Sequence, residues 1–333
     1  MECSLTRLVF CSAVQWAWPV PIIIGVFLAP ESPWWLVRKG RLDEAKTALR
    51  GLTSKTDGPY SIDDQVAMMV HTNEHEKSVS EGVTYWSCFT GVDLRRTEII
   101  SCVWMIQVWC GIWFGGNVVY FLEQAGFAST KAFDFGVGEN ALGFCGTMCS
   151  WFVMQHVGRR TLYLWGLGIM FSILALVGFL GIPEPSPAIG YVSGALLMLY
   201  VFTYDITVGP VCYCLVSEIP STRLRIKSVV LARNFYNIAS IVANFLNPPI
   251  LNPTAWNLRG KGGFIWCGFC LLSFTWSYFR LPEPKGLSSG EIDVLFERKI
   301  SARKFSKVKA DPFRSTNLKI VADNDEAPLQ EKN

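Results

Sequence analysis

The chain has 333 residues, of which 50% are hydrophobic and only 17% are charged, and its net charge at pH 7 is +3. Thirteen Trp and 22 Phe need a dry environment, so the composition excludes a disordered or collagen-like chain. The small net charge excludes the phosphate-binding surface of a nucleic-acid-binding protein. The apolar residues lie in long runs, which indicates a protein that spans a lipid bilayer.

Apolar segments long enough to cross a membrane recur along the chain, since a helical span takes about 20 residues. Because the runs are continuous rather than alternating, helices and not barrel strands are expected to satisfy the backbone in lipid. The sequence therefore predicts an all-α integral membrane protein. The seven expected spans are residues 8–28, 99–121, 137–156, 162–182, 190–217, 229–249 and 263–280.

The polar stretch 38–97 separates the first span from the second and is expected to form a cytoplasmic helical domain. Its pieces RLDEAKTALRGL and SIDDQVAMMVHTNEHEK are typical of short helices, the second with Ser61 as its N-cap. The sequence thus divides into a first transmembrane helix (1–37), this linker domain (38–97), a six-helix transmembrane half (98–281) and a largely disordered cytoplasmic tail (282–333).

Cysteine and histidine give no sign of a metal site, a cofactor or an enzyme. Most of the eleven Cys lie in apolar stretches and are expected to pack as small hydrophobic residues. Cys267 and Cys270 have a metal-like spacing but no second pair or nearby His. The three His (71, 75 and 156) form no catalytic arrangement.

Basic residues set the expected orientation, because cytoplasmic loops are enriched in Lys and Arg. If the spans alternate, most cations outside the spans fall on one side, which we expect to be cytoplasmic together with the C-terminus. This set comprises Arg159, Arg160, Arg223, Arg225, Lys227, Arg298, Lys299, Arg303, Lys304, Lys307 and Lys309, whereas the opposite loops hold Lys131, Arg259 and Lys261. An odd number of spans then places residues 1–7 outside without a signal peptide, so we expect further sequence upstream.

Short motifs lie at the ends of the expected spans. The stretch APESPWWLVRKGR (29–41) resembles the end of the sixth helix in the sugar porter family of the major facilitator superfamily, and its WWLVRKGR form is similar to fungal α-glucoside permeases of the maltose type. Further matches follow in the family's order. They are Gln107 with Gly111, Tyr120–Gly126, Gly158–Arg160, Tyr204-Asp205, Val208–Tyr213, Ser217–Pro220 and Leu281–Gly286.

This resemblance implies helix six, the central cytoplasmic domain and the C-terminal half of a major facilitator fold, about seven transmembrane helices in all. Helices one to five of the family have no counterpart here. Sugar porters bind substrate between two halves that move as rigid bodies. The resemblance therefore implies an incomplete transporter that is not expected to carry sugar by itself.

Sugar-binding candidates follow from the chemistry of a neutral polyol, which needs amides and hydroxyls together with aromatic faces. Gln107 places an amide inside a span, with helix–helix packing as the alternative role. Asp205 is a carboxylate inside a span, with a hydrated helix end as its alternative. Tyr213 lies where glucose porters have Trp, and either Asn234 or Asn237 is expected to match a sugar-contacting Asn.

Departures from the glucose-porter pattern bear on the size of the sugar. Val108, Trp113 and Gly143 lie where the family often has amides. These replacements leave more room and more aromatic surface, which favours a disaccharide.

Charged residues at the helix ends are expected to lock the cytoplasmic gate by pairing, as in the family. Opposite charges attract strongly near a low-dielectric boundary. Gly209-Pro210 and Pro248-Pro249 interrupt apolar spans and are candidate bending points. The expected lock consists of Glu31, Glu218 and Glu283 with Arg159, Arg160, Arg223 and Arg225.

The sequence therefore predicts a transmembrane transporter for an α-glucoside such as maltose, with glucose as a second candidate, in the plasma membrane. Proton coupling stays open, because the family's coupling acid is an Asp of the first helix. Two alternatives remain, a porter-like sugar sensor and a non-functional fragment. The tail of about fifty residues after the last span is short for a sensor.

We expect a reporter fused after residue 333 and another inserted near residue 70 both to be cytoplasmic, because the Lys and Arg residues cluster on that side. Protease protection of the two reporters in sealed vesicles measures this. An extracellular signal at either position contradicts the predicted topology.

Overall fold

The computed structural model describes residues 19–53, 61–80, 82, 84–124, 126–184, 186–221, 223–252, 255–256, 258–310 and 318–320. The chain forms two compact units, Met1–Gly82 and Val83–Asn333. The boundary at residue 82 lies before the one expected at residue 97, because Tyr85–Phe89 (η1) and the start of the next helix pack within the second unit.

The first unit contains α2 (Pro19–Leu28), α3 (Pro33–Arg38), α4 (Leu42–Leu52) and α5 (Ile62–Ser80). Helices α3, α4 and α5 share a small core. The two helices expected in the polar stretch are thus confirmed as α4 and α5, although α3 packs with them across the boundary expected at residue 37. The core consists of Leu36, Val37, Ala45, Ala48, Leu49, Val66 and Met69.

Polar contacts hold the start of α5. The Ser61 hydroxyl accepts a hydrogen bond from the Asp63 backbone N–H at 3.2 Å, which confirms Ser61 as the N-cap. The Lys46 ammonium of α4 lies 2.6 Å from the Asp63 carboxylate and, mainly by hydrogen bonding, lowers the pKa of Asp63. Both side chains are exposed, so the pair positions α5 more than it stabilises the unit.

Apolar helix α2 is the described part of the first expected span, and the rest of that span lies outside the described residues. None of its side chains is buried. With Ile22, Ile23, Val26 and Phe27 all more than half exposed, α2 needs lipid or another helix around it.

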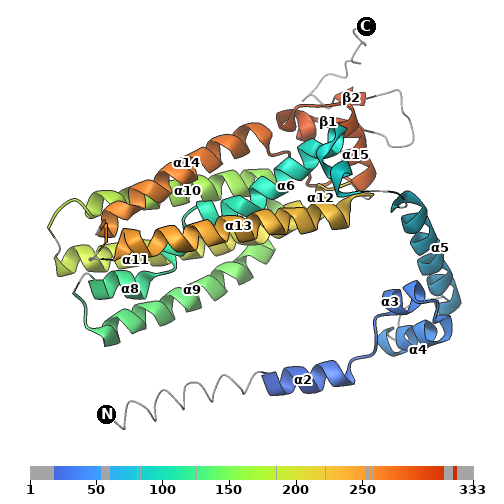
Figure 1. Ribbon diagram of the computed structural model, residues 1–333, viewed down its shortest axis with the longest axis horizontal. Helices are drawn as coiled ribbons and strands as arrows, with labels where there is room; N and C mark the ends of the chain where they lie inside the picture. Colours follow the sequence, from blue (N-terminus) through green and yellow to red (C-terminus); the bar gives the residue numbers. More distant parts are fainter. Residues whose placement is uncertain are drawn as a thin grey trace, which may run out of the picture. The chain divides into compact units, whose positions relative to one another are not determined.

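The second unit is a helical bundle with one small sheet. Its long helices run alongside one another, and α6 packs on α13, α9 on α11, and α10 on both α11 and α14 (Figure 1). The elements are η1, α6 (Gly91–Trp109), α7 (Ile112–Gly115), α8 (Val118–Gln124), α9 (Ser129–His156), α10 (Arg159–Leu180), α11 (Pro187–Ile206), α12 (Val208–Glu218), α13 (Arg225–Leu251), η2 (Arg259–Lys261), α14 (Gly262–Arg280), α15 (Ser289–Glu297), η3 (Ala302–Lys307), β1 (Val308–Ala310) and β2 (Leu318–Ile320).

Five helical segments of the described chain are long and apolar enough to cross a membrane, and each contains or overlaps one expected span. The expected span 137–156 forms part of α9, which is 28 residues long but carries Lys131, Asp134 and Glu139 and is not among the five. The five segments are Gly91–Glu123, Arg159–Leu180, Pro187–Glu218, Arg225–Leu251 and Arg259–Arg280.

The second expected span is broken between α6 and α7 at Gly111, whose φ is +101°. A side chain there would be strained, and its Cβ would lie 3.1 Å from the Trp266 Cβ. The break leaves the Cys110 carbonyl without a helical partner, and the buried Tyr200 hydroxyl donates to it at 2.7 Å. The carbonyl that the helix break leaves free is thus satisfied by a side chain of the neighbouring helix α11.

A second break separates α11 from α12 at Thr207, directly before Gly209-Pro210. Proline has no N–H to continue a helical ladder, so the bend expected near this pair is present. The Thr207 hydroxyl donates to the Thr203 carbonyl at 2.6 Å. By contrast, Pro248 and Pro249 lie inside α13, which continues to Leu251.

Residues 282–310 and 318–320 of the expected disordered tail contain regular elements, whereas the rest of that tail lies outside the described residues. Ser288 and Glu291 form a capping box at the start of α15, and Phe296 and Phe305 are buried in the same core as α6. The strands β1 and β2 pair antiparallel, with Lys309 opposite Lys319. In Figure 1, α15 and the strands lie at the end of the bundle where α6 begins.

Two arginines of α6 hold α15 in place. Arg96 is 4% exposed and pairs with the Asp293 carboxylate. The Arg95 guanidinium donates to the Ile300 carbonyl at 2.8 Å. Both guanidinium groups lie over the Phe296 ring, at 5.2 Å for Arg95 and 4.6 Å for Arg96. Specific polar contacts therefore order a segment that composition alone marks as hydrophilic.

We expect Asp293→Ala to lower the free energy of unfolding by about 3 kcal/mol, because Arg96 would keep a buried charge without a counter-ion. Denaturant unfolding in detergent, followed by Trp fluorescence, measures this. The control is Glu297→Ala, which removes an exposed carboxylate from the same helix and should change stability by less than about 0.5 kcal/mol. Equal effects of the two substitutions would contradict the assignment.

Candidate functional site

A cavity of about 690 Å³ lies beside the break in the α6–α8 segment. Helices α7 and α8, the end of α11 and the second half of α13 contribute its walls. The lining residues are Ile112, Trp113, Gly116, Asn117, Tyr120, Tyr204, Tyr236, Asn244, Asn247, Pro248, Leu251 and Asn252. The wall thus combines aromatic rings with side-chain amides, which is the chemistry that a polyol needs.

The Trp113 carbonyl joins the cavity wall to the irregular backbone. Trp113 lies in α7, and both Asn117 and Asn247 donate to its carbonyl, Asn247 at 2.7 Å. The Oδ1 of Asn247 and the indole Nε1 of Trp113 are buried without a hydrogen-bond partner among the described residues. One acceptor and one donor in the wall are therefore left unused, and an unpaired buried polar atom costs free energy.

Asn244 contributes a more accessible amide. Its side chain is exposed, and its Nδ2 donates to the Ser240 carbonyl one turn earlier in α13, at 2.9 Å. Its Oδ1 accepts no hydrogen bond in the described part of the chain. Asn237 precedes Asn244 by two turns and so lies on the same face of α13, whereas Asn234 is rotated away from that face. Both Asn234 and Asn237 are exposed, and neither lines the cavity.

Gln107 lies outside the cavity lining. It is 4% exposed, and its Nε2 donates to the Gly209 carbonyl at 3.1 Å, so it links α6 to α12 next to the second helix break. This contact is of the helix-packing kind that the sequence left open as the alternative to sugar binding.

Tyr213 belongs to an aromatic group that continues from the cavity wall along α12 and α13. Its ring packs edge-on against Trp104 at 5.0 Å, and Trp104 packs against Tyr236, a lining residue, at 5.4 Å. The Arg233 guanidinium covers both Trp104 at 4.7 Å and Tyr236 at 4.3 Å. Tyr213 itself is 58% exposed, so it offers a ring face on an open side of the bundle.

Asp205 faces α9 and is absent from the cavity lining. Its carboxylate lies so close to Gly143 that a Cβ at that glycine would be 2.6 Å from Oδ2. Glu139, one turn before Gly143 in α9, is 6% exposed and accepts no hydrogen bond in the described part of the chain. The structure therefore places Asp205 near a second carboxylate that sequence reasoning missed.

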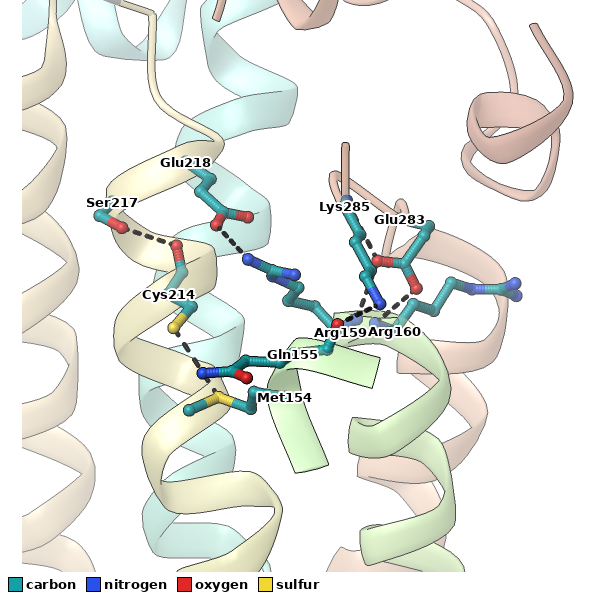
Figure 2. A network of polar contacts seen from close by, with 9 residues as sticks. All are labelled: Met154, Gln155, Arg159, Arg160, Cys214, Ser217, Glu218, Glu283 and Lys285. Carbon is teal, nitrogen blue, oxygen red and sulfur yellow. Dashed lines mark hydrogen bonds and ion pairs between the residues drawn. The ribbon is translucent and has the colours of Figure 1, made fainter. Parts of the chain in front are cut away.

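A network of polar contacts lies at the start of α10 (Figure 2). The Glu283 carboxylate accepts hydrogen bonds from the backbone N–H groups of Arg159 at 2.8 Å and Arg160 at 3.0 Å. These are the first residues of α10, whose free N–H groups and positive dipole end favour an anion. A Cβ at Gly158 would lie 2.2 Å from Glu283 Oε2, so a side chain there would displace this carboxylate.

Four helices meet through this network. Arg159 pairs with Glu218 at the end of α12 at 3.1 Å. Arg160 donates to the Tyr278 carbonyl of α14 at 2.8 Å, and Lys285 donates to the Gln155 carbonyl of α9 at 2.9 Å. The ends of α9, α10, α12 and α14 are therefore connected without any contact to the cavity.

The other residues of the expected lock lie outside this network. Arg223 and Arg225 form no ion pair with a described carboxylate, and the Arg225 Nε is buried without a partner there. Glu31 is exposed and belongs to the first unit. The structure thus brings together four of the seven predicted residues, namely Arg159, Arg160, Glu218 and Glu283.

Comparison with known proteins gives these features a context. The family model described as "Sugar (and other) transporter" matches residues 6–296. The chain belongs to the sugar transporter family. A maltose permease of Saccharomyces cerevisiae is 40% identical over 324 residues, which cover 96% of this chain and 52% of that protein. A general alpha-glucoside permease of the same yeast is 40% identical over 304 residues, which cover 90% of this chain and 49% of that protein.

The chain spans about half the length of these curated relatives. Among solved structures, the proton:xylose symporter XylE bound to 6-bromo-6-deoxy-D-glucose superposes with a TM-score of 0.61 and 22% identity over 84% of this chain and 57% of that one. The inward-open form of XylE from E. coli gives a TM-score of 0.54 and 19% identity over 83% and 54%. These likenesses confirm a partial major facilitator fold.

Sequence reasoning missed several cavity residues, among them Asn117, Tyr236 and Asn247. Each carries the signal that singled out Gln107, a polar group inside an apolar span. The sequence alone did not reveal the helix break at Gly111. Beyond this break, the Trp113 carbonyl accepts a hydrogen bond from Asn247 of α13.

We expect Glu283→Ala to lower the free energy of unfolding by about 1–3 kcal/mol, because two N–H groups at the start of α10 lose their acceptor. Thermal unfolding of the purified chain measures the change. Glu184→Ala, at an exposed carboxylate outside the helices, is the control and should leave stability unchanged. A Glu283 variant as stable as this control would show that the contact is dispensable.

Proposed function

We propose that this chain supplies the C-terminal half of a plasma-membrane transporter that takes up an α-glucoside such as maltose by alternating access. The main support for this proposal is the cavity beside the helix break, where amides and aromatic rings share one wall. Its volume of about 690 Å³ falls within the range of about 300–1,000 Å³ usual for small-molecule sites.

The wall matches the two surfaces of a sugar ring. Hydroxyl groups both donate and accept, so they suit the unpaired Asn247 Oδ1 and the accessible Asn244 amide. The C–H face of the ring suits the aromatic side chains of Trp113 and Tyr236. Trp113 also enlarges the aromatic surface, in keeping with a disaccharide rather than glucose.

The remaining predicted residues take supporting places in this proposal. Tyr213 of α12 and Asn237 of α13 lie outside the cavity lining and would contact only a substrate that reaches beyond the cavity, and Gln107 holds the two broken helices together. Asp205 and Glu139 of α9 form a separate carboxylate pair outside the cavity lining.

The network around Glu283 is proposed to close the cytoplasmic side. It joins the ends of α9, α10, α12 and α14, so these helices would move as one body. Alternating access requires a second body on the other side of the sugar. The described residues provide one wall, so transport is expected only when an N-terminal half is present.

The test is uptake of labelled maltose in a transport-deficient yeast strain. The chain is expressed alone and as a fusion behind the N-terminal half of the maltose permease to which it is 40% identical. We expect uptake by the fusion only. Uptake by the chain alone would contradict the two-half proposal, and a well-inserted fusion that binds no α-glucoside would contradict the substrate class.

In the same fusion, Asn244→Ala should weaken maltose binding roughly tenfold to a hundredfold, as expected for about 1–3 kcal/mol from one lost buried hydrogen bond. Asn140→Ala is the matched control, because Asn140 of α9 also donates to a carbonyl one turn earlier, at 2.8 Å, but lies outside the cavity lining. Equal affinities of the two variants would remove Asn244 from the site.

A further inference from the structure

A second cavity, of about 380 Å³, lies at the end of the bundle where α6 begins and α14 ends. The segment that follows α15 closes one side of it. Its lining residues are Gly91, Val92, Arg95, Phe279, Arg280, Lys299, Ser301, Ala302 and Phe296. None of these residues lines the cavity assigned to sugar.

Positive charge exceeds negative charge around this second cavity. Arg95, Arg280 and Lys299 line it, and Arg280 is paired with the carboxylate of Glu98. The other two lining cations, Arg95 and Lys299, form no ion pair with a carboxylate in the described part of the chain. Like charges held around one hollow at the edge of an apolar bundle favour an anion between them.

The two remaining cations have free donor capacity. Arg95 uses one terminal nitrogen on the Ile300 carbonyl, and its Nε is buried without a partner among the described residues. Lys299 is exposed, and its ammonium group has no partner in the described part of the chain. Lys299 follows the C-cap of α15 with a φ of +53°, a left-handed backbone conformation that glycine usually adopts after a helix. Here the chain instead places a cation at the rim of the cavity.

The surroundings are those of a membrane boundary. The cavity lies where two spans end, Gly91–Glu123 and Arg259–Arg280. Phe279, a lining residue, is 57% exposed, and Leu94, which precedes the lining residue Arg95 in α6, is 47% exposed. The Arg303 guanidinium lies over the rings of Tyr278 at 4.5 Å and Phe279 at 4.7 Å. Exposed apolar groups beside clustered cations and aromatic rings are typical of the interface between lipid tails and headgroups.

We propose that this cavity binds the phosphorylated headgroup of an anionic phospholipid. Arg95 and Lys299 would hold the phosphate, while Leu94 and Phe279 would lie along the acyl chains. A soluble phosphate compound would use the same cations but would gain nothing from the exposed apolar side chains. The inference rests on the membrane placement proposed above and is independent of which sugar, if any, the first cavity binds.

The experiment uses the full 333-residue chain purified in a detergent that carries no sugar. A fluorescent phosphatidylinositol 4-phosphate is titrated in mixed micelles and its anisotropy is recorded. Unlabelled phosphatidylinositol 4-phosphate, phosphatidylcholine and inorganic phosphate serve as competitors. We expect only the anionic lipid to compete at low micromolar concentration, an affinity of about 8 kcal/mol.

Three variants locate the binding site. Lys299→Gln should weaken binding about fivefold, the effect of one charge near an anionic lipid, and Lys299→Arg should restore it. Glu98→Gln removes the carboxylate that pairs with Arg280 and should strengthen binding. Lys261→Gln is the matched control, because Lys261 is also an exposed lysine. It lies in η2, directly before the start of α14, whereas the cavity lies at the end of α14.

Each outcome decides the proposal. Weaker binding by Lys299→Gln but not by Lys261→Gln supports the site. Equal effects of the two variants would overturn it as non-specific charge attraction. Competition by inorganic phosphate at the concentration of the lipid would overturn the lipid assignment. Maltose binding by the fusion is a separate measurement, so a negative result for one proposal does not contradict the other.

Discussion

The chief constraint on this bundle is that every backbone N–H and carbonyl inside lipid needs a partner. Where the helices are continuous, the ladder supplies it. At Gly111 the helical hydrogen-bond ladder stops. The carbonyls of Cys110 and Trp113 at this break accept hydrogen bonds from Tyr200 and Asn247 of neighbouring helices. The irregular backbone can therefore exist only where polar side chains surround it. The same side chains give the bundle its cavity, so the helix break and the candidate binding site arise from one cause.

Polar contacts at the helix ends follow the same logic. The free N–H groups at the start of α10 are satisfied by Glu283, which comes from the segment after α14. Arg96 of α6 is satisfied by Asp293 of α15. Both Glu283 and Asp293 come after α14 in the sequence. The described part of the tail is therefore held by polar groups of α10 and α6 that need a partner. These contacts stiffen one end of the bundle, whereas the cavity occupies a region of interrupted helices.

Sequence reasoning reached the fold through long-range composition and the site only in part. Continuous apolar runs fix the spans, and motif residues such as Gly158 and Glu283 mark their ends. The cavity depends on three-dimensional proximity between α7, α11 and α13, which no local pattern reports. Gln107 satisfied every local criterion for a binding amide, yet it bonds to Gly209 across a helix interface. The tail looked disordered by composition, because the aromatic contacts of Arg95 and Arg96 are also non-local.

The double role of Asn247 decides how the site should be probed. Its Nδ2 supports the broken helix through the Trp113 carbonyl, while its Oδ1 stays unpaired in the cavity wall. Removing this side chain would take away one of the two donors to the Trp113 carbonyl and also delete an acceptor for substrate, so a loss of binding would have two causes. Asn244 donates only to its own helix and is exposed. Its removal leaves the break intact, and a change in affinity there reports on the ligand alone.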